Sequence, residues 1–315
     1  MKILKNKLFL RAIGIAIFAY ILSKIEINEV TNILAKINFN YFLIGLLFFI
    51  PAILTKVYRW NRILKFQKIR IKTKNLLSPY IGTFGLGIIT PFKVGELARI
   101  AFLRNKKISL GTSAFSVVMD RILDVILFLL VGMISMLLLF SYFKDYLLSI
   151  LVVLLILTIL AMLLIGEKKG IFSLIMGLFV SKKIIEKTNM TMNELWREFK
   201  KMDFFFFIEV FAITAISWLF ANLEIYLFAA ALGINLTLLQ IIILVSISSI
   251  ANLLPITISG IGTRDAAFVF IFAIFGLTSE QAIALSLLVL IAWMIKAFFC
   301  MLFWWKNHIT IKEKE

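Results

Sequence analysis

Apolar runs of about twenty residues recur along the whole chain, and no other feature constrains its fold as strongly. A helix needs about 20 apolar residues to cross a hydrocarbon core of about 30 Å. Hydrophobic residues make up 62% of the 315 residues and charged residues only 16%, whereas a soluble domain is about half apolar and a quarter charged. The sequence therefore predicts an all-α integral membrane protein. No polar stretch is long enough to fold separately, so we expect residues 1–315 to form one membrane domain.

We predict about six transmembrane helices and two re-entrant hairpins. The first apolar run ends without a small-residue cleavage site, which favours a retained span over a signal peptide. Basic residues cluster in segments 56–74 and 166–203, eight in each. The positive-inside rule places such loops, and with them both termini, on the cytoplasmic side of the cell membrane. The predicted spans cover residues 8–25, 41–57, 109–140, 146–165, 204–230 and 281–305.

The formal net charge of +17 does not point to nucleic acid, because the basic residues follow the loop pattern of a membrane protein. The only cysteine, Cys300, excludes an internal disulfide and makes a thiolate metal site implausible. The only histidine, His308, lies in the C-terminal tail, so no Ser-His-Asp triad can form within the membrane. We therefore expect no metal, no cofactor and no nucleic-acid partner.

The segment "SPYIGTFGLGIITPFKVGELAR" predicts the first hairpin. If residues 75–90 crossed the bilayer, the basic residues that follow would lie outside, against the positive-inside rule. Three glycines and then Pro91 also weaken a helix there. We expect the chain to enter from the cytoplasm, turn near Pro91 and return. Irregular backbone at that depth is tolerated only where protein or a water-filled cavity surrounds it, so the hairpin should line an internal site.

The two halves of the chain share this order of features, in approximate units 41–140 and 204–305. Pro91 and Pro255 lie at nearly the same distance along the chain from the starts of their units, residues 41 and 204. The same holds for Arg99 and Arg264. The leading spans of the two units enter from opposite sides, so the repeat is inverted. Inverted repeats with interrupted helices that meet near the midplane are typical of transporters, and the interruptions point to the site.

An ionised side chain at the bilayer centre costs about 2.5 to 3.5 kcal/mol, so a group of such side chains there needs a reason. The charged side chains near the two hairpins therefore form the candidate site. One reading is structural: Glu96 with Arg99, and Arg121 with Asp124, are three residues apart on a helix and could neutralise each other. The other is that Lys93, Arg99 and Arg264 bind a phosphate. Two further acids, Glu209 and Glu224, could serve proton coupling or form structural hydrogen bonds. The candidate substrate-binding residues are Lys93, Glu96, Arg99, Asp120, Arg121, Asp124, Arg264 and Asp265.

Three ordered motifs, "PFKVGELAR", "MDRILD" and "LPITISGIGTRDAA", resemble the lysylphosphatidylglycerol synthase transmembrane-region family of flippase-like bacterial and archaeal membrane proteins. The resemblance covers nearly the whole chain. Two positions depart from the usual pattern: Ser259 stands where glycine is common, and Asp265 where glutamate is usual. The resemblance implies movement of a polar lipid across the membrane, either an aminoacyl-phospholipid or a lipid with a polyprenyl-phosphate-linked glycan. It also implies that the eight candidate residues form the headgroup path.

The family's aminoacyl transfer belongs to a separate soluble domain, which we expect this chain to lack, so a separate lipid-modifying enzyme is a possible partner. No P-loop is present, so movement should be downhill, ion-coupled or driven by a partner. We expect a lipid translocator and no catalytic residues. Three alternatives remain: an intramembrane phosphatase or transferase acting on a prenyl-phosphate lipid, a small-solute or ion transporter, and a structural subunit. The oligomeric state is not predicted.

Overall fold

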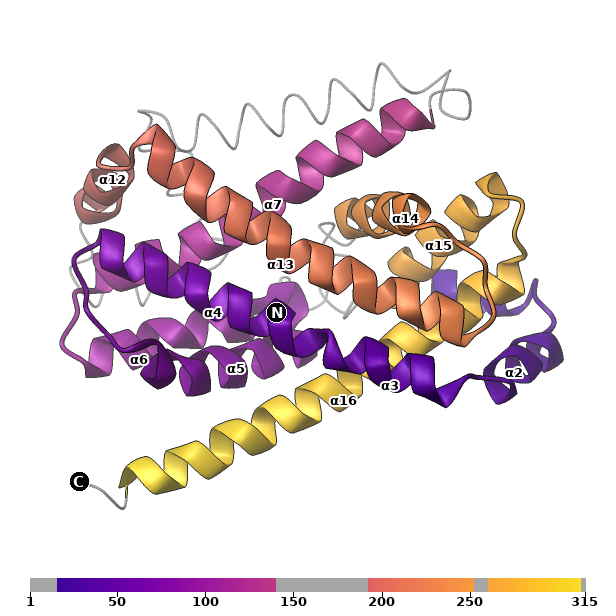
Figure 1. Cartoon of the computed structure of the whole chain (residues 1–315), viewed down its shortest axis with the longest axis horizontal. Helices are drawn as coiled ribbons and strands as arrows, with labels where there is room; N and C mark the ends of the chain where they lie inside the picture. Colours follow the sequence, from indigo (N-terminus) through magenta and orange to yellow (C-terminus); the bar gives the residue numbers. More distant parts are fainter. Residues whose placement is uncertain (1–15, 140–191, 252–259, 313–315) are drawn as a thin grey trace, which may run out of the picture.

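A computed structural model describes residues 16–139, 192–251 and 260–312, and every regular element in these ranges is helical (Figure 1). The backbone is also helical over residues 16–22, before α2. The helices are α2 (Ile27–Ala35), α3 (Phe39–Leu47), α4 (Phe49–Phe66), α5 (Thr73–Ile89), the 3₁₀ helix η1 (Pro91–Ala98), α6 (Arg99–Asn105), α7 (Leu110–Leu138), α12 (Met192–Lys200), α13 (Phe204–Ala231), α14 (Leu238–Ala251), α15 (Thr263–Ile274) and α16 (Ser279–Lys312).

Four helices among the described residues are long and apolar enough to cross a membrane: Phe39–Phe66, Leu110–Leu138, Phe204–Ala231 and Ser279–Lys306. Each matches one of the predicted spans, so an all-helical integral membrane protein is confirmed. The predicted span at 146–165 lies outside the described residues, as do residues 8–15 of the predicted span at 8–25. The count of six spans therefore stays a prediction.

The leading spans of the two predicted repeat units pack against each other in opposite directions. Aromatic rings pair along the seam, with centroids 5.3 Å apart for Phe42 and Phe228 at one end and 4.3 Å apart for Phe66 and Phe206 at the other. A Cβ on Gly45 would lie 2.8 Å from the Phe228 ring, so the glycine allows this close approach. Antiparallel leading spans are what an inverted repeat requires. The repeat itself stays a prediction.

The glycines that predict a weak helix over 75–90 lie instead within a continuous helix, α5. The glycines were predicted to weaken a helix there, but the helix is unbroken and the glycines act through packing. A Cβ on Gly82 would lie 2.3 Å from the Trp304 side chain of α16, and one on Gly85 would lie 2.8 Å from Cys300 Cβ. Small residues of this kind let helices approach closely in membranes, where lipid competes equally for apolar contacts. The α5 and α16 helices are therefore held together along a glycine-lined seam.

After α5 the chain reverses sharply. The Gly95 N–H donates to Thr90 Oγ1 at 2.8 Å, and a Cβ on Gly95 would lie 2.5 Å from the carbonyl carbon of Leu86. Lys93, the third residue of η1, has a φ of 55°. The predicted turn near Pro91 is thus present, and it places η1 and α6 back beside α5. Its depth in a bilayer stays a prediction, and the corresponding Pro255 lies outside the described residues.

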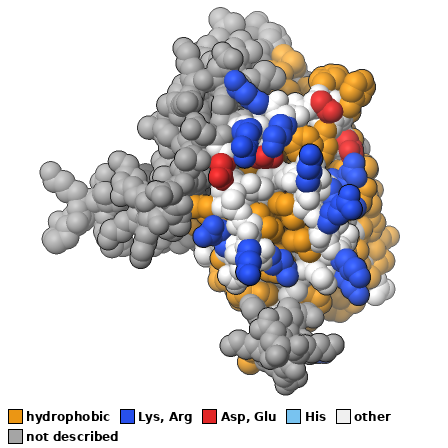
Figure 2. Space-filling model, turned by 90° about the vertical axis from the view of Figure 1, so that its left-hand side faces the viewer, with side chains coloured by type: hydrophobic (Ala, Val, Ile, Leu, Met, Phe, Trp, Pro, Cys, Tyr) orange, Lys and Arg blue, Asp and Glu red, His pale blue; other side chains and the backbone are white. Residues whose placement is uncertain are grey.

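One end of the molecule carries most of the exposed basic side chains. The end of α4 and the starts of α7 and α13 meet there, where Ile63, Phe115 and Val210 share a core cluster. Figure 2 shows this end, which lies on the left in Figure 1, with far more Lys and Arg than Asp and Glu. The last turns of α16 reach the same side. The basic segment 56–74, predicted as a loop, is helical to Phe66, because apolar residues continue at helical spacing beyond residue 57.

Candidate functional site

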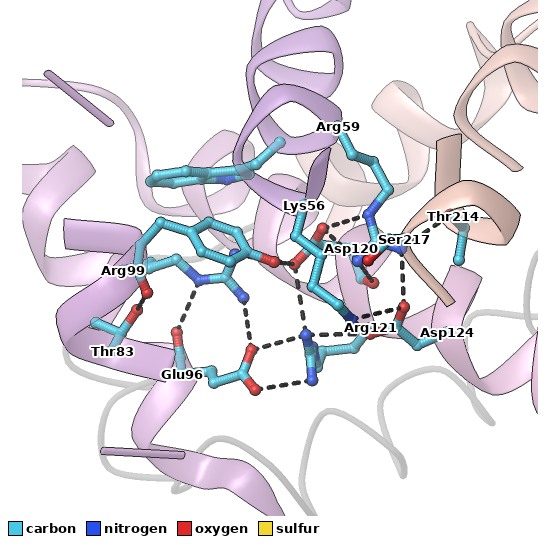
Figure 3. Close-up of polar contacts among 12 residues, drawn as sticks. Lys56, Arg59, Thr83, Glu96, Arg99, Asp120, Arg121, Asp124, Thr214 and Ser217 are labelled. Carbon is cyan, nitrogen blue, oxygen red and sulfur yellow. Dashed lines mark hydrogen bonds and ion pairs between the residues drawn. The ribbon is translucent and has the colours of Figure 1, made fainter. Parts of the chain in front are cut away.

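Two aspartates on α7 form the centre of a buried group of charges (Figure 3). Asp120 and Asp124 lie one turn apart on the helix face that packs inward, and they are 0% and 5% exposed. Asp120 follows the start of α7 at Leu110 by ten residues, a rise of about 15 Å at 1.5 Å per residue. A hydrocarbon core is about 30 Å thick, so the aspartates lie near its middle if α7 spans it. We call these residues and their five charged partners the α7 charge cluster, which comprises Lys56, Arg59, Glu96, Arg99, Asp120, Arg121 and Asp124.

Arg59 of α4 joins both aspartates. Its Nε donates to Asp120 Oδ1 at 2.7 Å, and its Nη1 donates to Asp124 Oδ1 and to Thr214 Oγ1 of α13, each at 2.8 Å. The Asp120 carbonyl accepts a fourth bond from Nη2 at 2.9 Å. The guanidinium is fully buried. One side chain thus ties α4, α7 and α13 together.

Arg99, the first residue of α6, approaches Asp120 from the opposite side. Its Nη1 donates to Asp120 Oδ2 at 2.9 Å and its Nη2 to Glu96 Oε2 at 3.0 Å. The rings of Tyr80 and Trp60 lie 4.3 and 5.3 Å from the guanidinium carbon, within the range of cation–π attraction. The Tyr80 hydroxyl also donates to Asp120 Oδ2, at 3.0 Å. Asp120 and Arg99 are therefore fully partnered and serve to position the rest of the cluster.

Arg121 and Lys56 form the accessible edge of the cluster. The Arg121 side chain is 23% exposed and lies 2.7 Å from Glu96 Oε2 and 3.2 Å from Asp124 Oδ2. Its Nε is buried and has no hydrogen-bond partner. The Lys56 ammonium lies 3.1 Å from Asp124 Oδ2, and its side chain is 12% exposed. These are the cations of the cluster that an incoming ligand could reach.

The cluster holds four cations against three carboxylates, a formal net charge of +1. Lys93 lies within electrostatic range of Glu96, Arg121 and Asp124 and makes no ion pair among the described residues. Taking unpaired charge out of water is costly, so the excess positive charge of this mostly buried cluster favours an anion. Lys93, which is exposed, adds a further positive charge beside the cluster. Within the described residues, no group of His, Cys, Asp or Glu could hold a metal ion.

Arg264 and Asp265 form a second polar group, at the start of α15. Arg264 Nε donates to Ser286 Oγ of α16 at 2.9 Å, and Asp265 accepts both the Ser286 hydroxyl and the Gly262 N–H. The Trp293 ring lies 5.3 Å from the Arg264 guanidinium carbon. Among the described residues, no hydrogen bond or ion pair joins this group to the α7 charge cluster. The structure thus brings five of the eight predicted site residues into direct contact, with Lys93 nearby, and places two in a separate group.

A third buried pair joins α13 to α16. Lys296 Nζ lies 2.6 Å from Glu224 Oε1, and the two side chains are 10% and 5% exposed. Asn222, two residues earlier on α13, donates to the Trp218 carbonyl rather than to Glu224. Glu209, the other acid, pairs with Arg62 near the surface.

Sequence reasoning missed Lys56, Arg59, Tyr80 and Lys296. The first two were assigned to a cytoplasmic loop, although the buried positions Ile53, Val57 and Trp60 recur at helical spacing around them. That periodicity was the signal for a longer helix with cations on its inner face. Lys296 stood as an isolated charge within a predicted span, which is itself a reason to expect a partner.

A family model described as "Lysylphosphatidylglycerol synthase TM region" matches residues 9–300 of the chain. No curated protein matches the sequence.

Proposed function

Because the chain belongs to the lysylphosphatidylglycerol synthase TM region family, we propose that it is a flippase or carrier that moves a phosphate-containing polar lipid across the cell membrane. The substrate class is an aminoacyl-phospholipid or a lipid with a polyprenyl-phosphate-linked glycan. The headgroup passes the α7 charge cluster, while the hydrocarbon chains stay at the depth of the bilayer core and do not cross with it. The basic end shown in Figure 2 faces the cytoplasm in this proposal, since cytoplasmic segments carry the excess of Lys and Arg.

The observation that carries the proposal is the accessible, net-positive edge of a buried cluster at mid-span. Arg121 lies within 4 Å of three carboxylates, at 2.7, 3.6 and 3.2 Å from Glu96, Asp120 and Asp124. A phosphate can replace one of these carboxylates on a guanidinium with the same forked geometry. Lys56, which also pairs with Asp124, then supplies a second positive charge. The acids keep the empty site close to neutral, and the exchange allows binding without trapping the headgroup.

Lys93, Arg264 and Asp265 retain the substrate-path role that the family resemblance implies, as part of this proposal. Lys93 precedes Glu96 in η1, its side chain is exposed, and it makes no ion pair among the described residues, so it is suited to meet the headgroup first. Arg264 keeps one buried nitrogen, Nη1, without a hydrogen-bond partner. A phosphate oxygen is a suitable acceptor for it.

One experiment with the purified protein in liposomes distinguishes movement of a lipid across the bilayer from chemical conversion of that lipid. Headgroup-labelled phosphatidylglycerol and a prenyl-phosphate lipid are followed across the bilayer, and the lipids are chromatographed afterwards. We expect faster movement of unchanged lipid, reduced at least tenfold in Arg121→Gln and Lys56→Gln. The control is Lys201→Gln, which removes a surface ion pair with Glu198 at the basic end. Conversion of the lipid would favour an enzyme, and no acceleration of either lipid would contradict the proposal.

A further inference from the structure

A groove opens between α7, α13 and α14, which lie together in Figure 1. It has a volume of about 160 Å³. Its walls are mostly apolar, and its mouth lies at Ala215 and Leu219, the exposed members of the lining. The lining residues are Leu127, Phe128, Val131, Ala215, Trp218, Leu219, Asn222, Ile242 and Ser246.

The inner wall of the groove is in contact with the α7 charge cluster through Trp218. The indole N–H donates to Asp124 Oδ1 at 3.3 Å, and the Lys56 ammonium lies 5.8 Å from the centre of the ring. The indole also packs edge-on against Phe128, with centroids 4.3 Å apart. One side chain therefore forms the boundary between the accessible edge of the cluster and an apolar space.

The groove lies at the middle of two membrane-spanning helices. Ala215 and Leu219 are near the centre of Phe204–Ala231, and Leu127 to Val131 follow the centre of Leu110–Leu138. At that depth the surrounding medium is hydrocarbon. The mouth of the groove therefore meets lipid chains rather than water.

One polar atom of the lining lacks a partner. Asn222 is 6% exposed, and its Nδ2 donates to the Trp218 carbonyl at 2.8 Å. Its Oδ1 has no hydrogen-bond partner. An unsatisfied polar group costs several kcal/mol in the hydrocarbon region. An occupant with an O–H or N–H group beside its hydrocarbon chain would supply the missing donor.

We propose that this groove binds one hydrocarbon chain, and the adjoining linker, of the lipid whose phosphate occupies the α7 charge cluster. The inference rests on the proposed function and adds a tail site to it. The ligand class is an amphiphile with a phosphate, a hydroxyl or amide donor near it, and an alkyl chain. The Trp218 indole separates the two parts of the bound lipid. A solute transporter would need no such groove.

The test is photolabelling of the purified protein in liposomes that contain phosphatidylglycerol with a diazirine in one acyl chain close to the glycerol. Ala215→Leu fills the mouth of the groove. Ala212→Leu adds the same volume one turn away on the exposed side of α13, outside the lining. We expect labelled peptides from the groove-lining parts of α7 and α13. Labelling should fall at least fivefold in Ala215→Leu and stay unchanged in Ala212→Leu. Size-exclusion profiles and unfolding temperatures establish that both variants are folded.

A second arm uses diacylglycerol with the same diazirine chain, which keeps a hydroxyl near that chain and lacks only the phosphate headgroup. We expect at least fivefold less labelling of the groove, since the headgroup positions the chain. Equal labelling by the two lipids would mean ordinary bilayer contact and would overturn the inference, as would unchanged labelling in Ala215→Leu. Labelling does not require transport. Groove labelling without translocation would count against the flippase, while translocation with unchanged labelling in Ala215→Leu would count against the groove.

Discussion

Arg59 and Arg62 lie one turn apart on α4, yet their surroundings differ completely. Arg59 is fully buried and bonded to two aspartates, a threonine and a backbone carbonyl. Arg62 pairs with Glu209 at 2.6 Å, with both side chains about one third exposed. Removing one partner of a buried pair leaves a charge with no compensation, whereas an exposed pair contributes little.

We therefore expect Arg59→Leu to lower the free energy of unfolding by about 3 to 5 kcal/mol, because Asp120 and Asp124 each lose a cation. Arg62→Leu, the matched control, should lower it by less than about 1 kcal/mol. Denaturant unfolding in detergent micelles measures both. Similar losses in the two variants would mean that the burial of Arg59 is not what stabilises the cluster.

At the scale of elements, the reversal between α5 and η1 positions Glu96 and Arg99, and it depends on Gly95. A Cβ there would lie 2.5 Å from the backbone of Leu86, which cannot rotate away. Gly132, between α7 and α14, has an equally close neighbour, but that neighbour is the terminal methyl of Ile250 at 2.3 Å. An added Cβ at Gly132 can therefore be accommodated by rotation of a side chain, whereas one at Gly95 cannot, because its neighbour is backbone.

Gly95→Ala should cost about 1 to 3 kcal/mol, as overpacking does, and it should also reduce lipid movement because η1 is pushed from α5. Gly132→Ala should cost less, because the Ile250 side chain can rotate. Unfolding and translocation assays on the two variants test this. The larger loss in Gly132→Ala would contradict the assigned packing.

At the scale of the whole molecule, the described loops lie at two opposite ends, because the long helices run between these ends. The basic end includes Lys68 and Lys106, which follow α4 and α6. The opposite end includes Thr237 and Thr278, which follow α13 and α15, and there the Asn38 N–H bonds to the Ala231 carbonyl at 2.8 Å. The proposed orientation places these two ends on opposite sides of the membrane.

Single cysteines introduced into a Cys300→Ser background test this arrangement in intact cells. We expect Thr237→Cys and Thr278→Cys to react with an impermeant maleimide from outside. Lys68→Cys and Lys106→Cys should react only after the cells are opened. The inverted hairpins further predict cytoplasmic access at position 93 and external access at position 263. Reaction of position 68 from outside would overturn the orientation.

Local spacing in the sequence predicted a useful part of the site. The pairs Glu96 with Arg99 and Arg121 with Asp124 are formed, at 3.0 and 3.2 Å. Each lies within one turn of a helix, where a sequence separation of three fixes proximity. Arg59 was missed because a stretch rich in basic residues was interpreted as a loop, while its carboxylate partners lie far along the chain.

The sequence by itself determined that the chain is a helical membrane protein and about where its described spans run, although it ended the span from residue 41 at residue 57 and the helix continues to Phe66. Hydrophobic length and helical spacing are properties of consecutive residues, so they need no fold. The tertiary structure alone decided which charges meet. Arg59 and Asp120 are 61 residues apart in the chain and pair only because α4 packs on α7. It also decided that the α5 glycines form a packing seam, since the space available to a glycine depends on the neighbouring helix.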